Sequence, residues 1–184
     1  MAGALVIVTG APGVGKSTLA RRLARDWPGE AALHIHSDDM WTWFAKGFIP
    51  PWEPRSHDQN LVVTRAMAAN AATLAQAYPV IFDGVVGPWF APLFVEAAEA
   101  ARVRLDYMVL RPDRATAVAR GTGREGHPMR DPAVIGAMWD QFADLGSLEA
   151  HALDTTGLDL TATAELARDA LASRRLRIVE PENY

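Results

Sequence analysis

The chain contains no cysteine, so disulfide bonds and thiolate metal sites are excluded. It has no apolar run approaching the roughly 18 residues that span a bilayer, so we expect no membrane partner. It also lacks an excess of positive charge, because its formal net charge is −4, and this argues against a nucleic-acid partner. The apolar N-terminus carries no basic leader, so we expect a cytoplasmic protein without a signal peptide.

What the chain does have is enough apolar residues for a sizeable core. Hydrophobic residues occupy 49% of its 184 positions, which is typical of a globular domain. No repeat, linker or low-complexity tract divides the sequence. We therefore expect residues 1–184 to form a single domain, present as a monomer or a homodimer.

Short apolar runs alternate with helical patterns along the chain. The runs expected to form strands are 4–9, 31–36, 79–83, 104–110 and 151–154. Helical patterns cover 17–26, 58–78, 91–101, 113–120, 131–145 and 161–174. Ser37 is expected to cap one further helix. This alternation predicts an α/β fold, in which helices cover both faces of a parallel sheet.

A G-x-x-x-x-G-K-[ST] motif joins the first strand to the first helix. Its residues are Gly10, Ala11, Pro12, Gly13, Val14, Gly15, Lys16, Ser17 and Thr18. The strand before it and the helix after it distinguish a phosphate-binding loop from an ordinary glycine-rich turn. The glycines let backbone N–H groups surround a polyphosphate, Lys16 reaches the β- and γ-phosphates, and the Ser17 hydroxyl is placed to ligate Mg²⁺. The motif predicts binding of a nucleoside triphosphate, with ATP and Mg as cofactors.

Two aspartates follow the second and third strands, whose carboxyl ends meet at one edge of a parallel sheet. Asp38 stands where a carboxylate would orient a hydroxyl acceptor and take its proton, although it also suits the first turn of a helix. Asp83 ends an apolar strand, where we expect it to support magnesium together with Ser17. An Asp-Gly pair such as Asp83-Gly84 is also a common turn.

Three arginines lie in or beside a glycine-rich segment, 121–130, that we interpret as a lid over the nucleotide. They are Arg120, Arg124 and Arg130. Arginines delivered by such a lid stabilise charge on a transferring phosphoryl group. A solvated basic loop would have the same composition.

Aromatic side chains concentrate between the second strand and residue 90. Those assigned to an acceptor pocket are Trp41, Phe44, Trp52 and Trp89, with Gln59 as a polar contact. Trp41 and Phe44 also fit a helix face that packs in the core, and Gln59 also fits a helix cap. The histidines show no metal-ligand spacing and receive no role: His36, His57, His127 and His151.

Taken together, the phosphate loop, Ser37-Asp38-Asp39, Asp83-Gly84 and the arginine segment resemble the small P-loop kinases. Those include nucleoside monophosphate, shikimate and gluconate kinases, chloramphenicol phosphotransferase and the kinase domain of polynucleotide kinases. The resemblance spans about residues 4–172. It implies a P-loop NTPase fold with a five-stranded parallel sheet ordered 2-3-1-4-5, and ATP as phosphoryl donor.

One departure from this family narrows the expected acceptor. Monophosphate kinases typically follow the Asp-Gly of the third strand with an aromatic residue, Pro and Arg, whereas this chain continues from Gly84 as Val-Val-Gly-Pro-Trp. We therefore expect an ATP-dependent kinase that phosphorylates a hydroxyl of a small molecule. The alternatives are a nucleoside monophosphate kinase, a polynucleotide 5′-kinase, and a regulatory P-loop NTPase without an acceptor.

Overall fold

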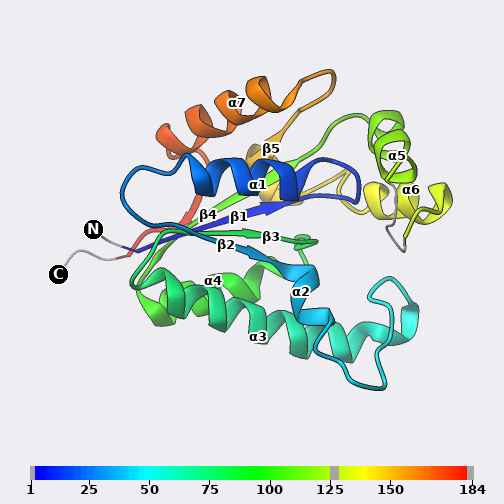
Figure 1. Ribbon diagram of the computed structural model, residues 1–184, viewed down its shortest axis with the longest axis horizontal. Coiled ribbons are helices and arrows are strands. Elements are labelled where there is room, and N and C mark those ends of the chain that lie inside the picture. Colours follow the sequence, from blue (N-terminus) through cyan, green and yellow to red (C-terminus); the bar gives the residue numbers. More distant parts are fainter. Residues whose placement is uncertain (1–2, 125–128, 182–184) are drawn as a thin grey trace.

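The computed structural model describes residues 3–124 and 129–181, with a twisted parallel sheet at its centre (Figure 1). The parallel strands are β1 (Ala4–Thr9), β2 (Leu33–His36), β3 (Val80–Asp83), β4 (Arg104–Leu110) and β5 (Ala152–Leu153). They lie in the order β2-β3-β1-β4-β5. The predicted α/β class and the strand order implied by the kinase resemblance are therefore confirmed.

A further strand, β6 (Arg177–Val179), was not predicted from the sequence and pairs with β4 in antiparallel orientation. The sheet thus has six strands among the described residues, five of them parallel. Arg177 Nε donates a 2.7 Å hydrogen bond to Asp106 Oδ1 on β4. Because Asp106 is buried, this contact fixes β6 to the sheet by neutralising a carboxylate inside the fold.

Helices cover both faces of the sheet (Figure 1). Helices α1 (Lys16–Arg25) and α7 (Leu160–Ala172) lie on one face, and α3 (His57–Ala75) and α4 (Ala91–Ala101) lie on the other. Beyond the carboxyl ends of the strands are α2 (Ser37–Trp41), α5 (Arg114–Thr122) and α6 (Pro132–Asp140). The short 3₁₀ turns are η1 (Pro54–Ser56) and η2 (Gly146–His151). This arrangement leaves one end of the sheet for the functional residues.

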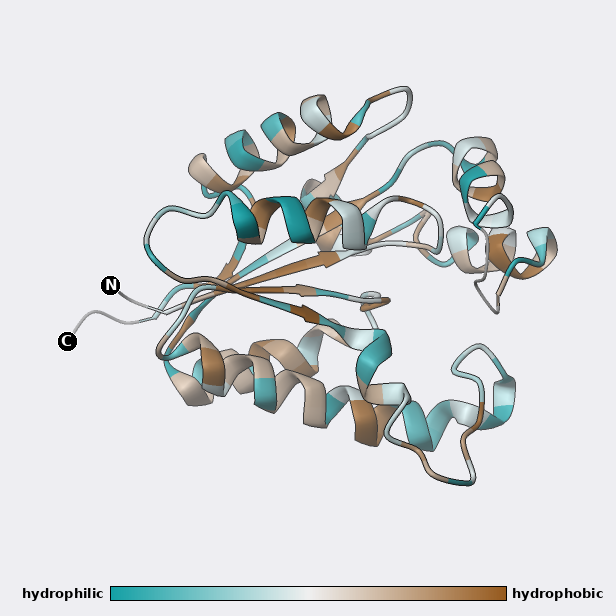
Figure 2. Ribbon diagram, viewed as in Figure 1, coloured by the Kyte–Doolittle hydropathy of each residue, from teal (hydrophilic) through white to brown (hydrophobic). Residues whose placement is uncertain are grey.

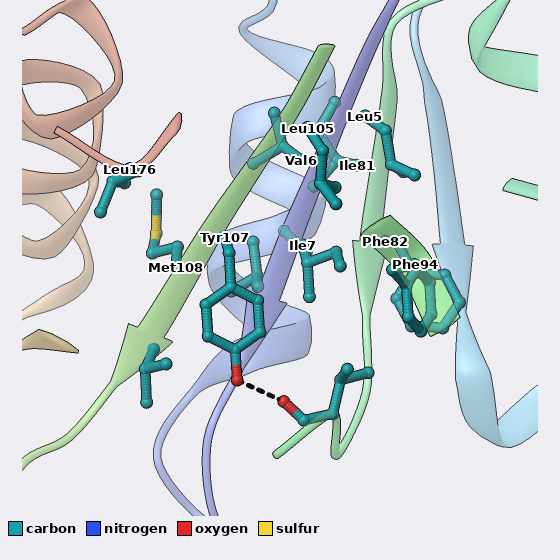
Figure 3. Packing of buried hydrophobic residues seen from close by; sticks show 14 of the residues in the cluster. Leu5, Val6, Ile7, Ile81, Phe82, Phe94, Leu105, Tyr107, Met108 and Leu176 are labelled. Carbon is teal, nitrogen blue, oxygen red and sulfur yellow. Dashed lines mark hydrogen bonds between the residues drawn. The ribbon is translucent and has the colours of Figure 1, made fainter. Parts of the chain in front are cut away.

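The strands at the centre are mostly hydrophobic, whereas the helices around them mix hydrophobic and hydrophilic residues (Figure 2). All six residues of β1 are buried, as expected for a strand between two parallel neighbours. Phe82 of β3 packs against Phe94 of α4 with ring centroids 5.0 Å apart (Figure 3). Within the described ranges, no helix combines the length and apolarity needed to cross a membrane.

Several local expectations were wrong. The helix expected over 131–145 ends at Asp140, and the 3₁₀ turn η2 begins at Gly146. Ser37 is the first residue of α2 and does not cap it, since His36 holds the extended N-cap position. The start of the expected lid, Gly121 and Thr122, is the last turn of α5 and not a loop. Gly121 is buried there against α6, where a Cβ would lie 2.8 Å from Ile135 Cδ1. Residues 125–128 of the expected lid lie outside the described residues.

Candidate active site

The phosphate loop connects the buried strand β1 to the start of α1. Gly10, Gly13 and Gly15 have φ angles of 135°, 83° and 97°, a region that residues with a side chain rarely adopt. Gly15 is the N-cap of α1 and supplies no side chain to satisfy the first N–H groups of the helix. These N–H groups, with the positive end of the helix dipole, form a site for an anionic phosphate.

Lys16 lies at the first turn of α1, beside this anion site. Its Nζ donates a 2.9 Å hydrogen bond to the carbonyl oxygen of Ala11, within the loop itself. Burial lowers the pKa of Lys16 to about 8, although the negative charges of Asp83 and Asp38 oppose the shift. A polyphosphate beside the amine would supply the counter-charge that its charged form needs.

Ser17 and Asp83, the two predicted magnesium residues, are in direct contact. Ser17 Oγ donates a 2.5 Å hydrogen bond to Asp83 Oδ2, and Asp83 is fully buried at the end of β3. A hydroxyl next to a carboxylate gives the oxygen ligands that Mg²⁺ prefers, so this pair fits the ion. Among the described residues, no group of three or more His, Asp or Glu side chains is placed to hold a metal without further ligands. Nucleotide phosphates would complete the coordination.

Two histidines of β2 hydrogen-bond the same carboxylate: His36, for which the sequence predicts no role, and His34. His34 Nε2 lies 2.5 Å from Asp83 Oδ1, and His36 Nδ1 lies 3.0 Å from Asp83 Oδ2. Burial alone would raise the pKa of Asp83, but the hydrogen bonds from His34, His36 and Ser17 outweigh it and hold that pKa well below its usual range. The hydrogen bond to Asp83 raises the pKa of His36 in turn. One feature of the sequence indicates this contact. His34 and His36 are two residues apart on β2, so both rings lie on one face of the strand that pairs with β3, the strand ending in Asp83.

Asp38 lies in the first turn of α2, and its side chain is 60% exposed. Its carboxylate opens onto the cavity that the phosphate loop also lines. His36 Nε2 is 3.6 Å from Asp38 Oδ2, and Ser37 Oγ is 3.4 Å from Oδ1. The negative charge of Asp38 also acts on Lys16 and Arg124. The structure therefore brings Asp38 and the phosphate loop together in the lining of one cavity.

One cavity of about 920 Å³ contains these groups. Away from the phosphate loop its wall carries many apolar side chains, those of Trp41, Trp52, Met67, Phe82, Val85, Val86, Trp89 and Phe90. The polar residues Glu53, Ser56, His57, Asn60 and Thr64 line it as well. The lysine and arginine side chains in the described wall are Lys16, Arg120 and Arg124. The cavity thus combines the phosphate loop and its cations with a wall that is apolar in large part and also carries polar residues.

The loop between α2 and η1 is fixed to α3 by polar side chains at the start of that helix. Gln59 Oε1 accepts from the backbone N–H of Ile49 at 3.0 Å, and Gln59 Nε2 donates to the Ile49 carbonyl at 2.6 Å. Asn60 Nδ2 donates to the carbonyl of Pro51 at 2.7 Å. Gln59 therefore holds the wall and does not line it, which differs from its expected role as a substrate contact. Phe44 stacks on Trp41 with ring centroids 6.3 Å apart and is not among the residues that line the cavity, contrary to its expected role in an acceptor pocket.

Buried polar side chains of β1 and β4 hydrogen-bond the segment that follows β3. Tyr107 of β4 donates a 2.6 Å hydrogen bond from its hydroxyl to the carbonyl of Val86 (Figure 3). Thr9 Oγ1 donates to the same carbonyl at 3.1 Å and accepts from the Val86 N–H at 2.8 Å. These contacts fix Val86, which lines the cavity together with Val85. Trp89, further along the same segment, also lines the cavity and is 45% exposed.

Two of the three arginines of the expected lid line the cavity, and the third does not. Arg120 and Arg124 line the cavity, whereas Arg130 lies outside its described wall and donates from Nε to the Thr122 carbonyl at 3.0 Å. Burial lowers the pKa of Arg124, against the opposing charge of Asp38. Arg124 Nη2 is buried without a hydrogen-bond partner among the described residues. An unsatisfied buried guanidinium N–H beside Lys16 and Asp38 suits an incoming phosphate oxygen.

Helix α6 forms part of the cavity wall, a role that the sequence does not predict. Val134, Ala137 and Met138 of α6 line the cavity, as does Gln141 directly after the helix. Helix α6 packs on α5, and Arg114 on α5 hydrogen-bonds Asp140 through its Nε at 2.8 Å. A helical apolar pattern gives no sign of which cavity a helix will line, because that depends on how it packs in the fold.

Comparison with solved structures shows which fold carries this site. A gluconokinase from Sinorhizobium meliloti 1021 has a TM-score of 0.67 at 18% identity, over 93% of each chain. A tunicamycin resistance protein from Deinococcus radiodurans has a TM-score of 0.62 at 16% identity, over 98% of this chain and 99% of its own. The APS kinase of Mycobacterium tuberculosis has a TM-score of 0.61 at 15% identity, over 93% of this chain and 98% of its own.

At the level of sequence, no curated protein matches the chain. The AAA domain family does match it, over residues 6–137. That range includes the phosphate loop, both aspartates and the two cavity arginines. The chain has the fold of the small P-loop kinases, and it belongs to the AAA domain family.

Proposed function

We propose that this protein transfers the γ-phosphate of ATP to a hydroxyl group of a small molecule that carries no anionic group. The observation that supports the proposal is the lining of one cavity. Lys16, Ser17 and Asp83 line it together with the phosphate loop, and Asp38 and several aromatic side chains line the same cavity.

In this proposal each residue has a separate task. The phosphate loop and Lys16 bind the β- and γ-phosphates. Ser17 and Asp83 would hold Mg²⁺, which would neutralise phosphate charge. Asp38 orients the acceptor hydroxyl and accepts its proton, while the hydroxyl oxygen forms a bond to the γ-phosphorus and the bond to the bridging oxygen breaks, releasing ADP. Arg120 and Arg124 stabilise the charge on the phosphoryl group in transit.

The wall chemistry argues for the type of acceptor. A buried phosphate needs cationic side chains around it, since desolvating an unpaired dianion is very costly. The described wall carries its lysine and arginines where the donor phosphates are expected. The aromatic and aliphatic side chains of the wall instead favour an acceptor with an aromatic or aliphatic body.

The test is a screen of hydroxylated metabolites and antibiotics with ATP and magnesium, read as phosphorylated product by mass spectrometry. We expect a neutral alcohol to be phosphorylated in preference to AMP or CMP. Efficient phosphorylation of AMP or CMP would favour a monophosphate kinase. Salt-sensitive binding and phosphorylation of an oligonucleotide 5′-hydroxyl would favour a polynucleotide kinase. Rapid ATP turnover with no acceptor would favour a regulatory NTPase.

A further inference from the structure

The two histidines of β2 are not used by the reaction described above, yet they lie at its centre. The parallel register of β2 and β3 sets His36 opposite Asp83 and His34 opposite Ile81. The two imidazole rings are near neighbours on the same face, with centroids 6.4 Å apart. Both therefore approach the one carboxylate that ends β3.

The contacts of the two histidines differ in one respect. His34 contacts Asp83 Oδ1, whereas His36 uses Nδ1 for Asp83 Oδ2 and turns Nε2 toward Asp38, 3.6 Å from its Oδ2. A single imidazole ring thus stands between the carboxylate that would support magnesium and the carboxylate that would receive the acceptor proton. The position of Asp38 needs such support, because its side chain is 60% exposed and its hydrogen bond from Ser37 Oγ is long, at 3.4 Å.

We propose that His36 is a positioning residue that couples Asp38 to Asp83, and that His34 holds Asp83 alone. This inference rests on the proposed phosphotransfer function. The 3.6 Å separation is longer than a hydrogen bond, but contacts of catalytic groups in ligand-free sites commonly shorten when the substrate binds. His36 then fixes Asp38 relative to the phosphate end, and a loss of that alignment costs turnover more than nucleotide binding.

The competing explanation is that both histidines merely satisfy a buried carboxylate. That role is common to His34 and His36, whereas contact with Asp38 belongs to His36. Amide substitutions separate the two roles because the Asn amide nitrogen takes the place of imidazole Nδ1, and the Gln amide nitrogen takes the place of Nε2. His36→Asn keeps the bond to Asp83 and loses the reach to Asp38. His34→Gln keeps its Nε2-type bond to Asp83 and is the matched control.

The first measurement needs no acceptor. Crystal structures with magnesium and the ATP analogue AMP-PNP are compared for wild type, His36→Asn and His34→Gln, together with calorimetric affinity for the analogue and melting temperature. We expect all three proteins to melt and bind alike. In wild type and His34→Gln, Asp38 should adopt one conformer within hydrogen-bond distance of His36, and in His36→Asn it should leave that position. An unchanged Asp38 conformer in His36→Asn would overturn the proposal.

The second measurement uses the acceptor that the wild-type screen identifies. We expect His36→Asn to lower kcat by about a hundredfold with KM for ATP unchanged, and His34→Gln to lower it far less. Added to Asp38→Asn, the His36→Asn change should have no further effect, because the group it positions is already gone. Equal loss in both histidine variants would overturn the inference. Failure of the proposed function is a separate result, seen as a wild-type protein that phosphorylates no alcohol.

Discussion

At the scale of single residues, the charge of Lys16 reflects the balance between burial and nearby carboxylates. Its pKa is about 8 in the folded protein, against an ordinary value of 10.5. Below about pH 8 the folded protein must keep a charged amine in a poorly solvated site. Between these two pH values the unfolded chain binds a proton that the folded chain does not, so stability rises with pH over this window.

We therefore predict that Lys16→Met is more stable than wild type near neutral pH in the absence of nucleotide. The difference between the two proteins should shrink as the pH rises from about 8 toward 10, because wild type then buries a neutral amine. Urea unfolding of both proteins at several pH values measures this difference. A stability difference that stays constant across the window would contradict the assignment of a lowered pKa to Lys16.

Asp38 allows a prediction that separates chemistry from helix stability. Asp38→Asn removes a proton acceptor but keeps the size of the side chain, so phosphoryl transfer should fall by about two to four decades. Binding of ATP should change little, because Asp38 lies beyond the phosphate loop in the cavity. Single-turnover kinetics and thermal melting on the same samples test both statements. Lower melting with an unchanged rate would show that Asp38 only supports the first turn of α2.

At the scale of elements, the loop before η1 owes its position to α3. We predict that Gln59→Ala costs about 1–2 kcal/mol of unfolding free energy, since two hydrogen bonds to Ile49 are lost. The released loop should raise KM for the acceptor and leave the affinity for ATP unchanged. Gln76→Ala, after the other end of α3, is the control, because Gln76 contacts the Ala101 carbonyl far from the cavity wall. Equal acceptor KM in the two variants would exclude the loop-holding role.

The phosphate loop and α5 are in close contact, which makes Gly13 sensitive to any side chain. An added Cβ would lie 2.5 Å from the Ala117 carbonyl oxygen and 2.6 Å from the Gly121 nitrogen. We predict that Gly13→Ala loses ATP binding and melts well below wild type. Gly146→Ala is the matched control, because Gly146 also has a positive φ but open space around it. Its cost should be limited to about 1–2 kcal/mol of backbone strain. Calorimetric ATP titration and melting temperatures distinguish the two, and similar losses would refute the steric argument.

At the scale of the whole molecule, a buried ion pair links β6 to β4, next to their antiparallel backbone pairing. Side-chain exposure is 12% for Arg177 and 2% for Asp106. We predict that Arg177→Met destabilises the fold by about 3 kcal/mol, because it leaves the Asp106 carboxylate buried with a weaker partner, Arg104, at 3.9 Å. Arg175→Ala, at an exposed neighbouring position, should have little effect. Urea unfolding measures both, and a loss below about 1 kcal/mol for Arg177→Met would show that the pair is dispensable.

The accuracy of the bounds predicted from the sequence differs from element to element. The strand 4–9, the helix 91–101 and the strand 104–110 have the predicted bounds, because long apolar or periodic segments carry their own signal. Helix ends were less accurate: α3 stops at Ala75, although the helical pattern was read to residue 78. The strand β6 was missed because three residues give almost no periodicity, and its place depends on an ion pair with distant Asp106.

By itself, the sequence determined the phosphate loop, the α/β class and the positions of Asp38 and Asp83 at strand ends. These features depend on contiguous residues, whose backbone and side-chain demands are local. Only the tertiary structure decided that His34 and His36 meet Asp83, that Gln59 holds a loop, and that α6 lines the cavity. His34 and Asp83 are 49 positions apart in the sequence, and Gln59 and Ile49 are 10 apart. Strand register and helix packing bring such residues together, and no local sequence pattern predicts these contacts.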